Sequence, residues 1–446
     1  MNKKQNDLLA IYLNEFNFKY LLKGAKKYSC KNILEILNLN KVETFTKDIY
    51  QDVDLDPWVQ SVSINTGKSS KKHKILKLGQ PLKKKQFQIW DKLSKNKISC
   101  SVWGTMNSKL RKNKYLNYYF PDPWNFKDNT YPKNLMGLYF LPNYYAKNYL
   151  KFNYFKFFYF SILFFSTLVN YVNLKIFIKD LFLSFKFFIK KGIKNFALFF
   201  LFDQIFLNIV HKTTQKKKSN FSMIFLNSIA HYQHNNWNET EYEKYFFLYV
   251  DNIFKKILEI KKEFNSFILF NGFTQRKIST EFILRPKDPN KFLSRFIKFK
   301  RLEQDMTNGG FLFFDDKKKR NFAFKILSKL TCFEKKIFYI KKFNTLSIYY
   351  KINLKSKKIL NNYNVSFKKN YSKRYLFENI KLKKKTINQI DVSEYFIKNI
   401  KFIKSSGVHT PQGLLIHNNL QTLNKKNKIA NHKIFKFLSQ HFGVYA

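Results

Sequence analysis

The chain has 446 residues, of which 83 are Lys or Arg and 29 are Asp or Glu, so its formal net charge is +54. This length allows a large buried core, in one domain with insertions or in two to three smaller ones. Three widely spaced cysteines, Cys30, Cys100 and Cys332, exclude a small disulfide-stapled fold and indicate a reducing compartment.

The positive charge is compatible with polyanionic partners, either nucleic acid or an anionic membrane surface. The basic residues are spread along the whole chain, however, and Lys, Phe, Asn, Ile and Tyr are abundant while there are only 12 Gly and 9 Pro. A coding sequence poor in G and C produces this composition, so we favour a reduced, AT-rich genome over selected RNA binding as its cause. No secretory signal precedes residue 7. We therefore expect the protein in the cytoplasm of a reduced-genome bacterium or in the mitochondrial matrix.

Strands and helices alternate in the first 144 residues. Residues 7–18 predict a buried strand that ends on the polar residues Asn14, Glu15 and Asn17, and a helical pattern follows to residue 38. Pro57 and Gly67 mark the start and stop of a short helix. The sequences QIWDKL and KISCSVWGTMNS then indicate a helix followed by a strand.

A Phe- and Lys-rich helical insertion is predicted for residues 145–218. Within it, residues 157–174 carry no charge and lie between lysines, which makes them a candidate membrane helix. Their Asn, Ser and Thr residues favour a buried or interfacial helix at least as strongly.

The strand and helix pattern resumes at residue 219. We assign residues 1–144, 219–310 and 401–446 to one core, and residues 311–400 to a lysine-rich cap or peripheral segment. The alternation predicts an α/β fold with a mostly parallel central sheet flanked by helices.

His231 and His234 are three residues apart after an apolar run. On a helix they would share a face and could bind one divalent cation or one phosphate oxygen. Two histidines on a helix surface are the alternative interpretation.

Several phrases together resemble uncharacterised bacterial members of the alkaline phosphatase-like superfamily, which includes type I phosphodiesterases, nucleotide pyrophosphatases and sulfatases. These phrases occur in a matching order: PWVQSVSINTG, QIWDKL, VWGTMN, FPDPW, FLNSIAHYQH, NGFTQ and GVHTPQG. The resemblance implies a central sheet with a hydrolytic site at the strand ends, one or two divalent metals, usually zinc, and a hydroxyl or modified Cys nucleophile.

By position, the resemblance implies that Glu15, His231, His234 and His409 bind the metal. It places the nucleophile among the hydroxyls of residues 54–67, with Thr66 as first choice and Ser63 as another candidate. Several expected ligands are replaced: Asn65 stands for a histidine, Asn271-Gly272 for an Asp-His pair, and Thr274 and Pro289 for histidines. Asn and Gly cannot replace a carboxylate and an imidazole as ligands, so a complete two-metal site is not expected.

Two functions follow from these observations. The first is metal-dependent hydrolysis of phosphate or sulfate esters, with a small ester as substrate and zinc as the expected cofactor. The second is a catalytically inactive structural or accessory protein of an organellar or membrane-associated assembly. Its partners would be RNA, anionic lipid or other proteins of the assembly.

Overall fold

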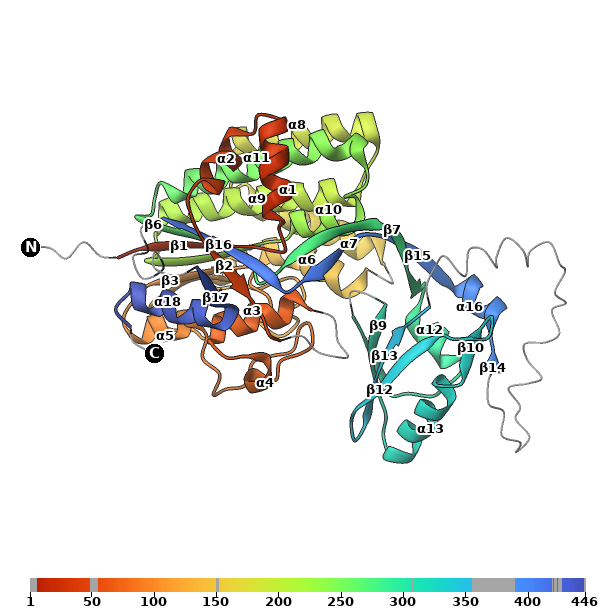
Figure 1. The fold of residues 1–446 in the computed structure, drawn as a ribbon. Coiled ribbons are helices and arrows are strands. Elements are labelled where there is room, and N and C mark those ends of the chain that lie inside the picture. Colours follow the sequence, from red (N-terminus) through yellow and green to blue (C-terminus); the bar gives the residue numbers. More distant parts are fainter. Residues whose placement is uncertain are drawn as a thin grey trace, which may run out of the picture. The chain divides into compact units, whose positions relative to one another are not determined.

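A computed structural model describes residues 6–48, 55–149, 152–305, 308–354, 390–418, 420, 423 and 427–444 (Figure 1). The chain forms two compact units. The first consists of Met1–Lys277 and Gly407–Ala446, and the second of Ile278–Ser406.

An eight-stranded sheet forms the centre of the first unit. The central strand β1 (Leu8–Leu13) is parallel to β5 (Phe221–Leu226) on one side and to β6 (Ser266–Phe270) on the other. The remaining strands are β2 (Asn40–Phe45), β3 (Cys100–Trp103), β4 (Leu116–Phe120), β16 (Gln412–Asn418) and β17 (Lys428–Ala430), and the order is β17-β2-β16-β6-β1-β5-β3-β4. Only β16 runs antiparallel to its neighbours. The predicted fold class, α/β with a mostly parallel sheet, is confirmed.

Helices cover both faces of this sheet, as Figure 1 shows. One face carries α1 (Phe18–Lys27), α2 (Lys31–Leu37), α8 (Leu174–Lys191), α9 (Asn195–Lys216), α10 (Ser228–Asn235) and α11 (Thr240–Lys261). The other carries α3 (Pro57–Thr66), α4 (Ser70–His73), α5 (Ile89–Lys95) and α18 (Ile434–His441). β1 is buried along its whole length because both faces of the sheet are covered, which explains its uninterrupted apolar sequence.

The helix predicted after Asp56 is confirmed as α3. Pro57 occupies its first turn, where a missing N–H costs nothing, and Gly67 ends it in the left-handed conformation at a φ of 66°. Every residue of α3 is buried, including its polar ones.

The helical insertion contains the end of α6 (Met136–Asn148), then α7 (Tyr154–Leu168), α8 and α9. Residues 157–174 do not form one membrane-length helix. α7 ends at Leu168, and Asn173 begins α8 by accepting hydrogen bonds from the N–H groups of Lys175 and Ile176. With 15 residues, α7 is about 22 Å long, shorter than the about 30 Å hydrocarbon core.

Within the part of the chain that the structure describes, one helix is long and apolar enough to cross a membrane by length and composition, namely α9. Its most apolar window is 67% buried, as in the core helix of a soluble protein.

The second unit has its own core and spans Ile278–Ser406, so it includes residues 278–310 and 401–406, which were expected in the main core. Its main sheet is antiparallel, in the order β12-β13-β9-β8. These strands are β8 (Arg301–Gln304), β9 (Gly309–Phe313), β12 (Phe338–Asn344) and β13 (Ser347–Ile352). A smaller sheet contains β10 (Leu330–Cys332), β11 (Lys335–Lys336) and β14 (Ile390–Asp391). The helices are α12 (Pro289–Ser294), α13 (Lys317–Leu327) and α16 (Ser393–Asn399).

The chain enters the second unit along β7 (Thr274–Pro286) and leaves it along β15 (Ile400–Thr410), and these two strands pair with each other. His409 therefore lies on a strand, next to the last residue of β15.

Candidate metal centre

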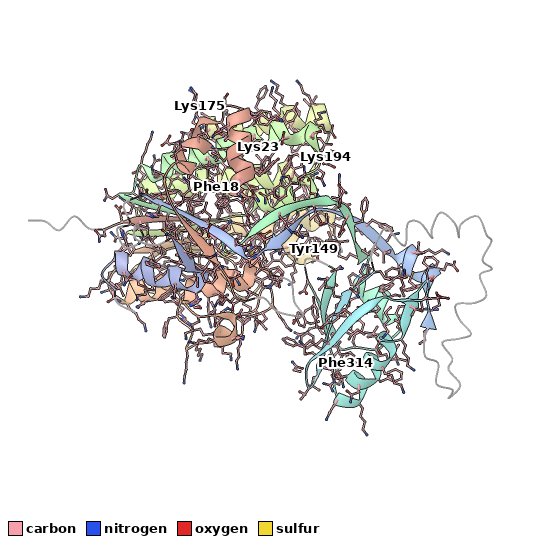
Figure 2. The ribbon with its side chains drawn as sticks, viewed as in Figure 1. Phe18, Lys23, Tyr149, Lys175, Lys194 and Phe314 are labelled. Atoms are coloured by element: carbon pink, nitrogen blue, oxygen red, sulfur yellow. The ribbon has the colours of Figure 1, made fainter. Side chains whose placement is uncertain are left out.

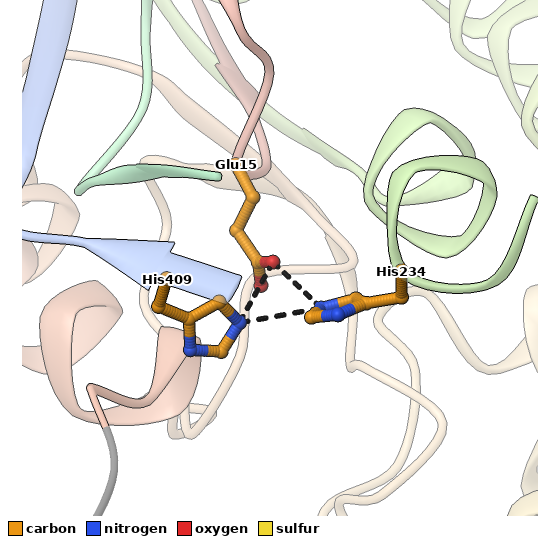
Figure 3. Close-up of side chains that lie close together, drawn as sticks. All are labelled: Glu15, His234 and His409. Atoms are coloured by element: carbon orange, nitrogen blue, oxygen red, sulfur yellow. Dashed lines mark hydrogen bonds and ion pairs between the residues drawn. The ribbon is translucent and has the colours of Figure 1, made fainter. Parts of the chain in front are cut away.

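Three side chains from distant parts of the chain converge in the first unit (Figure 3). The Nε2 atom of His234 lies 2.8 Å and that of His409 3.0 Å from Oε2 of Glu15, and the two Nε2 atoms are 3.2 Å apart. Within the described ranges, this is the single group of three or more such side chains whose ligand atoms lie close enough together to hold a metal ion.

Glu15 occupies the turn between β1 and α1. Its φ of 56° is left-handed, which is uncommon for a side chain of this size and costs on the order of 1 kcal/mol or more. The turn is held in place: Gln233 Nε2 donates to the carbonyl of Glu15 at 3.0 Å, and Thr274 Oγ1 donates to that of Phe16 at 2.7 Å. The surrounding structure thus keeps a strained backbone in the conformation that directs Glu15 towards the two histidines.

The two histidines are positioned by separate elements. His234 lies on α10, whose first turn is fixed by the Asp203 carboxylate, which accepts from the N–H groups of Asn227 at 3.1 Å and Ser228 at 2.9 Å. His409 lies near the end of β15, and its ring packs against Phe273 with centroids 4.7 Å apart.

Glu15 is 2% exposed, and this burial opposes the charged form of its carboxylate. The neighbouring His409 and His234 outweigh burial and hold the pKa of Glu15 well below its ordinary value. Amide groups also stabilise the charge, since Asn14 Nδ2 donates to Oε1 at 2.9 Å and Gln275 Nε2 to Oε2 at 2.5 Å. The site therefore presents an ionised carboxylate at neutral pH.

One carboxylate and two imidazoles form a donor set suited to zinc, which binds nitrogen and oxygen ligands in tetrahedral geometry. At zinc–ligand distances of about 2.0–2.2 Å, neighbouring tetrahedral ligand atoms lie about 3.3–3.6 Å apart. The three observed separations, 2.8, 3.0 and 3.2 Å, are shorter, so the three side chains would have to move apart slightly to hold the ion. The side chains of His234 and His409 are 34% and 19% exposed, so solvent reaches both imidazoles.

His231 does not join the three ligands. Its ring stacks on Phe199 with centroids 3.5 Å apart, and its Nε2 lies 3.3 Å from Nδ2 of Asn227. Burial, and then the neighbouring His234, lower the pKa of His231 to about 3, so it is neutral. His231 and His234 were predicted to bind one ion together. In the structure His234 lies beside Glu15, whereas the ring of His231 packs on Phe199.

Ser63 is fully engaged away from this cluster. His73 Nδ1 accepts from the N–H of Ile75 at 3.0 Å, so in the neutral ring Nε2 carries the proton and donates to Ser63 Oγ at 3.1 Å. Ser63 in turn donates to Asp48 Oδ2 at 3.1 Å. Burial lowers the pKa of His73 to about 4 against the opposing effect of Asp48. A histidine that donates to a serine cannot act as its base, so this group has a structural role.

The hydroxyl of Thr66 forms its hydrogen bond within α3. Its Oγ1 donates to the carbonyl of Val62, one turn earlier, at 2.7 Å. Asn65, at the position where the resemblance implies a histidine, donates to Ser61 Oγ at 3.2 Å.

At Asn271 and Gly272 the resemblance implies an Asp-His pair of metal ligands, and the described structure leaves no room for that pair. A Cβ atom on Gly272 would lie 2.7 Å from the Tyr12 hydroxyl and 2.8 Å from the Cβ of Gln60, so these side chains fill the space that a ligand would need. Asn271 instead supports the Glu15 turn by donating to the carbonyl of Phe16 at 2.9 Å. Asp288 caps α12 by accepting from the N–H of Lys291 at 3.0 Å.

Gln233 and Gln275 hold Glu15 in place, and neither was predicted as a site residue. Gln275 is the last residue of the phrase NGFTQ and donates to the Glu15 carboxylate, whereas Gln233 lies between the two histidines of HxxH and donates to the Glu15 carbonyl. Glutamine next to a ligand segment is the only local signal, and it does not specify a partner.

No family model and no curated protein matches the chain. Solved structures do resemble it over nearly its full length. Murine ectonucleotide pyrophosphatase/phosphodiesterase 5 in complex with AMP gives a TM-score of 0.49 at 9% identity, covering 99% of this chain and 96% of that one. The human protein of that name gives 0.47 at 9% identity over the same shares. Alkaline phosphatase from the Antarctic bacterium TAB5 gives 0.42 at 10% identity over 100% of both chains.

These proteins belong to the alkaline phosphatase-like superfamily, the one that the sequence motifs resemble. A likeness at this level of identity and TM-score gives none of the residues of this chain a role.

Proposed function

We propose that the protein binds one divalent cation, with zinc as the best fit, through Glu15, His234 and His409, and that it hydrolyses phosphate esters there. The observation that supports this proposal is the meeting of three ligand atoms from three distant segments, all within 4.8 Å of one another. The motif resemblance supplies the substrate class, with sulfate esters as the second possibility.

The chain's own residues would contribute binding and orientation. Glu15, His234 and His409 offer one carboxylate and two imidazole nitrogens, and Gln275 and Asn14 fix the carboxylate. A bound zinc ion would polarise a phosphoryl oxygen and lower the pKa of a water molecule. The charge of +54 attracts anionic substrates.

The hydroxyls of Ser63 and Thr66 are committed to other hydrogen bonds, so the proposal takes water as the nucleophile. The water oxygen forms the new bond to phosphorus, the ester oxygen leaves, and the proton released by the water finally resides on the leaving alcohol or on the phosphate product.

The test combines metal analysis with turnover. Purified protein should contain close to one zinc per chain and should hydrolyse an aryl phosphate, a bis-aryl phosphate or an aryl sulfate. His234→Ala should lose both properties, whereas His211→Ala, on the partly exposed surface of α9, should keep both. A protein with no bound metal, or with turnover unchanged in His234→Ala, would contradict the proposal.

A second candidate function is that of a metal-stabilised protein without catalysis. It is favoured because Tyr12 and Gln60 fill the space at Gly272, and because the Ser63 hydroxyl is hydrogen-bonded to Asp48. It predicts zinc at one per chain, no turnover of any of the three esters, and a fall in melting temperature on chelation. In that case, RNA, lipid or partner proteins should copurify with the full chain at moderate salt.

A further inference from the structure

Helix α8 exposes a continuous apolar stripe. Leu174, Ile178, Phe182, Phe185 and Ile189 are spaced by four, four, three and four residues, which places them on one helix face. They are 51%, 63%, 66%, 61% and 70% exposed. At on the order of 100 Å² for each side chain, the stripe exposes about 500 Å², as much as the largest apolar patch on a typical monomer.

The buried face of α8 combines two polar residues, Asp180 and Ser184, with the aromatic Phe187. The Asp180 carboxylate pairs with the buried Lys256 at 2.9 Å. Asn208 and Asn252 donate to the same carboxylate at 2.8 and 3.0 Å. A surface helix of a soluble domain directs its apolar stripe inward. In α8 the five stripe residues face outward, while the Asp180–Lys256 ion pair lies inside and holds the helix in this orientation.

The preceding helix α7 carries a second stripe. Phe155, Phe158, Ile162, Phe165 and Val169 follow a spacing of three, four, three and four residues, with the last just beyond the helix end, and are 89%, 68%, 53%, 50% and 51% exposed. The inward side of this helix consists of Phe164 and Leu168. Two successive helices of the first unit thus leave large aromatic surfaces uncovered.

Lysines border the α8 stripe. Lys175, Lys179, Lys186 and Lys190 are exposed, and each directly follows a stripe residue, which places it about 100° around the helix. Figure 2 shows Lys175 at the outer edge of the helical layer. Asp180 is the one acidic residue of α8, and its charge is neutralised inside. Apolar side chains bordered by unopposed lysines are complementary to lipid tails beneath anionic headgroups.

We propose that α8 docks the protein on the surface of an anionic lipid bilayer. The stripe residues enter the boundary between headgroups and acyl chains, and the four lysines contact headgroup phosphates. The helix lies in the plane of the interface and does not cross the bilayer, because Lys179 and Lys186 interrupt its middle.

The experiment is flotation of the full chain with vesicles of phosphatidylcholine alone or with 30 mol% phosphatidylglycerol, at low salt and at about 0.5 M salt. We expect tight binding to the anionic vesicles. Phe182→Asp with Ile189→Asp should weaken it at least tenfold. The matched control is Phe322→Asp with Leu346→Asp, which changes exposed apolar residues of the second unit by the same charge and should weaken it no more than twofold.

The lysines need their own control because the whole chain is basic. A variant with Lys175→Gln, Lys179→Gln, Lys186→Gln and Lys190→Gln should lose most of the preference for anionic vesicles. Gln in place of four exposed lysines of the second unit, Lys317, Lys318, Lys325 and Lys336, removes the same charge and should leave most of the preference intact. Equal losses in the two sets would show general charge attraction and would overturn the proposal.

A second readout does not depend on affinity. All three native cysteines are buried, so a Phe182→Cys variant can be labelled selectively with an environment-sensitive dye. Its emission should shift to the blue on anionic vesicles, and a dye at Phe322→Cys should not shift. An unshifted spectrum at position 182, or a stable dimer that covers the stripe and does not bind vesicles, would refute membrane docking.

Discussion

Replacing Gly407 with Ala tests how the metal ligands are held together. Gly407 lies on β15, two residues before His409, and a Cβ atom there would lie 2.3 Å from Gln275 Oε1 and 2.7 Å from the carbonyl oxygen of Gln233. Cβ contacts below 3.0 Å are essentially never seen, so the neighbours must separate by at least 0.7 Å (3.0 minus 2.3) and 0.3 Å (3.0 minus 2.7). Moving Gln275 disturbs its bond to Glu15, and moving β15 displaces His409.

Metal–ligand distances tolerate about 0.2 Å. We therefore expect the Gly407→Ala variant to bind zinc about 10–100-fold more weakly, in the range found for lost supporting contacts, and to lose about 1–3 kcal/mol of stability through overpacking. Competition with a chromogenic chelator measures the first effect and chemical unfolding of the apoprotein the second.

Gly192→Ala is the matched control. Gly192 differs from Gly407 in having a positive φ, of 72°, which is unfavourable for an L-residue, but nothing lies within 4 Å of its added Cβ. It should lose about 1–2 kcal/mol through backbone strain alone and bind zinc with unchanged affinity. Equal zinc affinities for Gly407→Ala and the unmodified protein would refute this account of the site's packing.

Three further predictions concern the surrounding structure. The pKa of His73 is about 4 in the folded protein and about 6.5 in the unfolded chain. The free energy of unfolding should therefore fall by about 3 kcal/mol as the pH is lowered from 6.5 to 4, because only the unfolded chain binds the proton in this range. In urea unfolding, the stability of His73→Gln should depend less on pH over the same range. Asp180→Ala should cost about 3–5 kcal/mol in chemical unfolding, since it leaves Lys256 buried and unpaired, whereas Asp180→Leu with Lys256→Met should recover most of this loss. Ser63→Ala should lose about 1–2 kcal/mol and keep kcat/KM within twofold; a tenfold fall would make Ser63 part of the reaction.

Local sequence signals predicted the parts of the fold that depend on local physics. The apolar run of β1, and Pro57 with Gly67 around α3, specify their elements through burial and backbone preference alone. Residues 311–400 were predicted to be a separate lysine-rich segment, but its strands were not predicted. In β12, Phe338 is buried whereas Lys341, Lys342, Phe343 and Asn344 are all exposed, so this strand lacks the alternation of buried and exposed residues by which a strand is predicted.

The candidate site was predicted only in part, because the sequence indicates which residues can bind a metal but not which distant side chains pack against them. The strand end indicated Glu15, and the HxxH spacing indicated two ligands. The spacing cannot distinguish His231 from His234, because the difference is made by Phe199 of α9, which stacks on the first ring. In the same way, Gly272 was visible as a lost ligand, but the side chains of Tyr12 and Gln60 that fill its place come from elsewhere in the chain.

Zinc stoichiometry measured after equilibrium dialysis tests the central proposal most directly. We expect close to one zinc per chain in the unmodified protein and in His231→Phe, which keeps a ring against Phe199. We expect none retained in Glu15→Gln, His234→Ala or His409→Ala at micromolar zinc, with folding of each variant checked by circular dichroism. Absence of zinc from the unmodified protein, or its loss from His231→Phe but not from His234→Ala, would contradict the account.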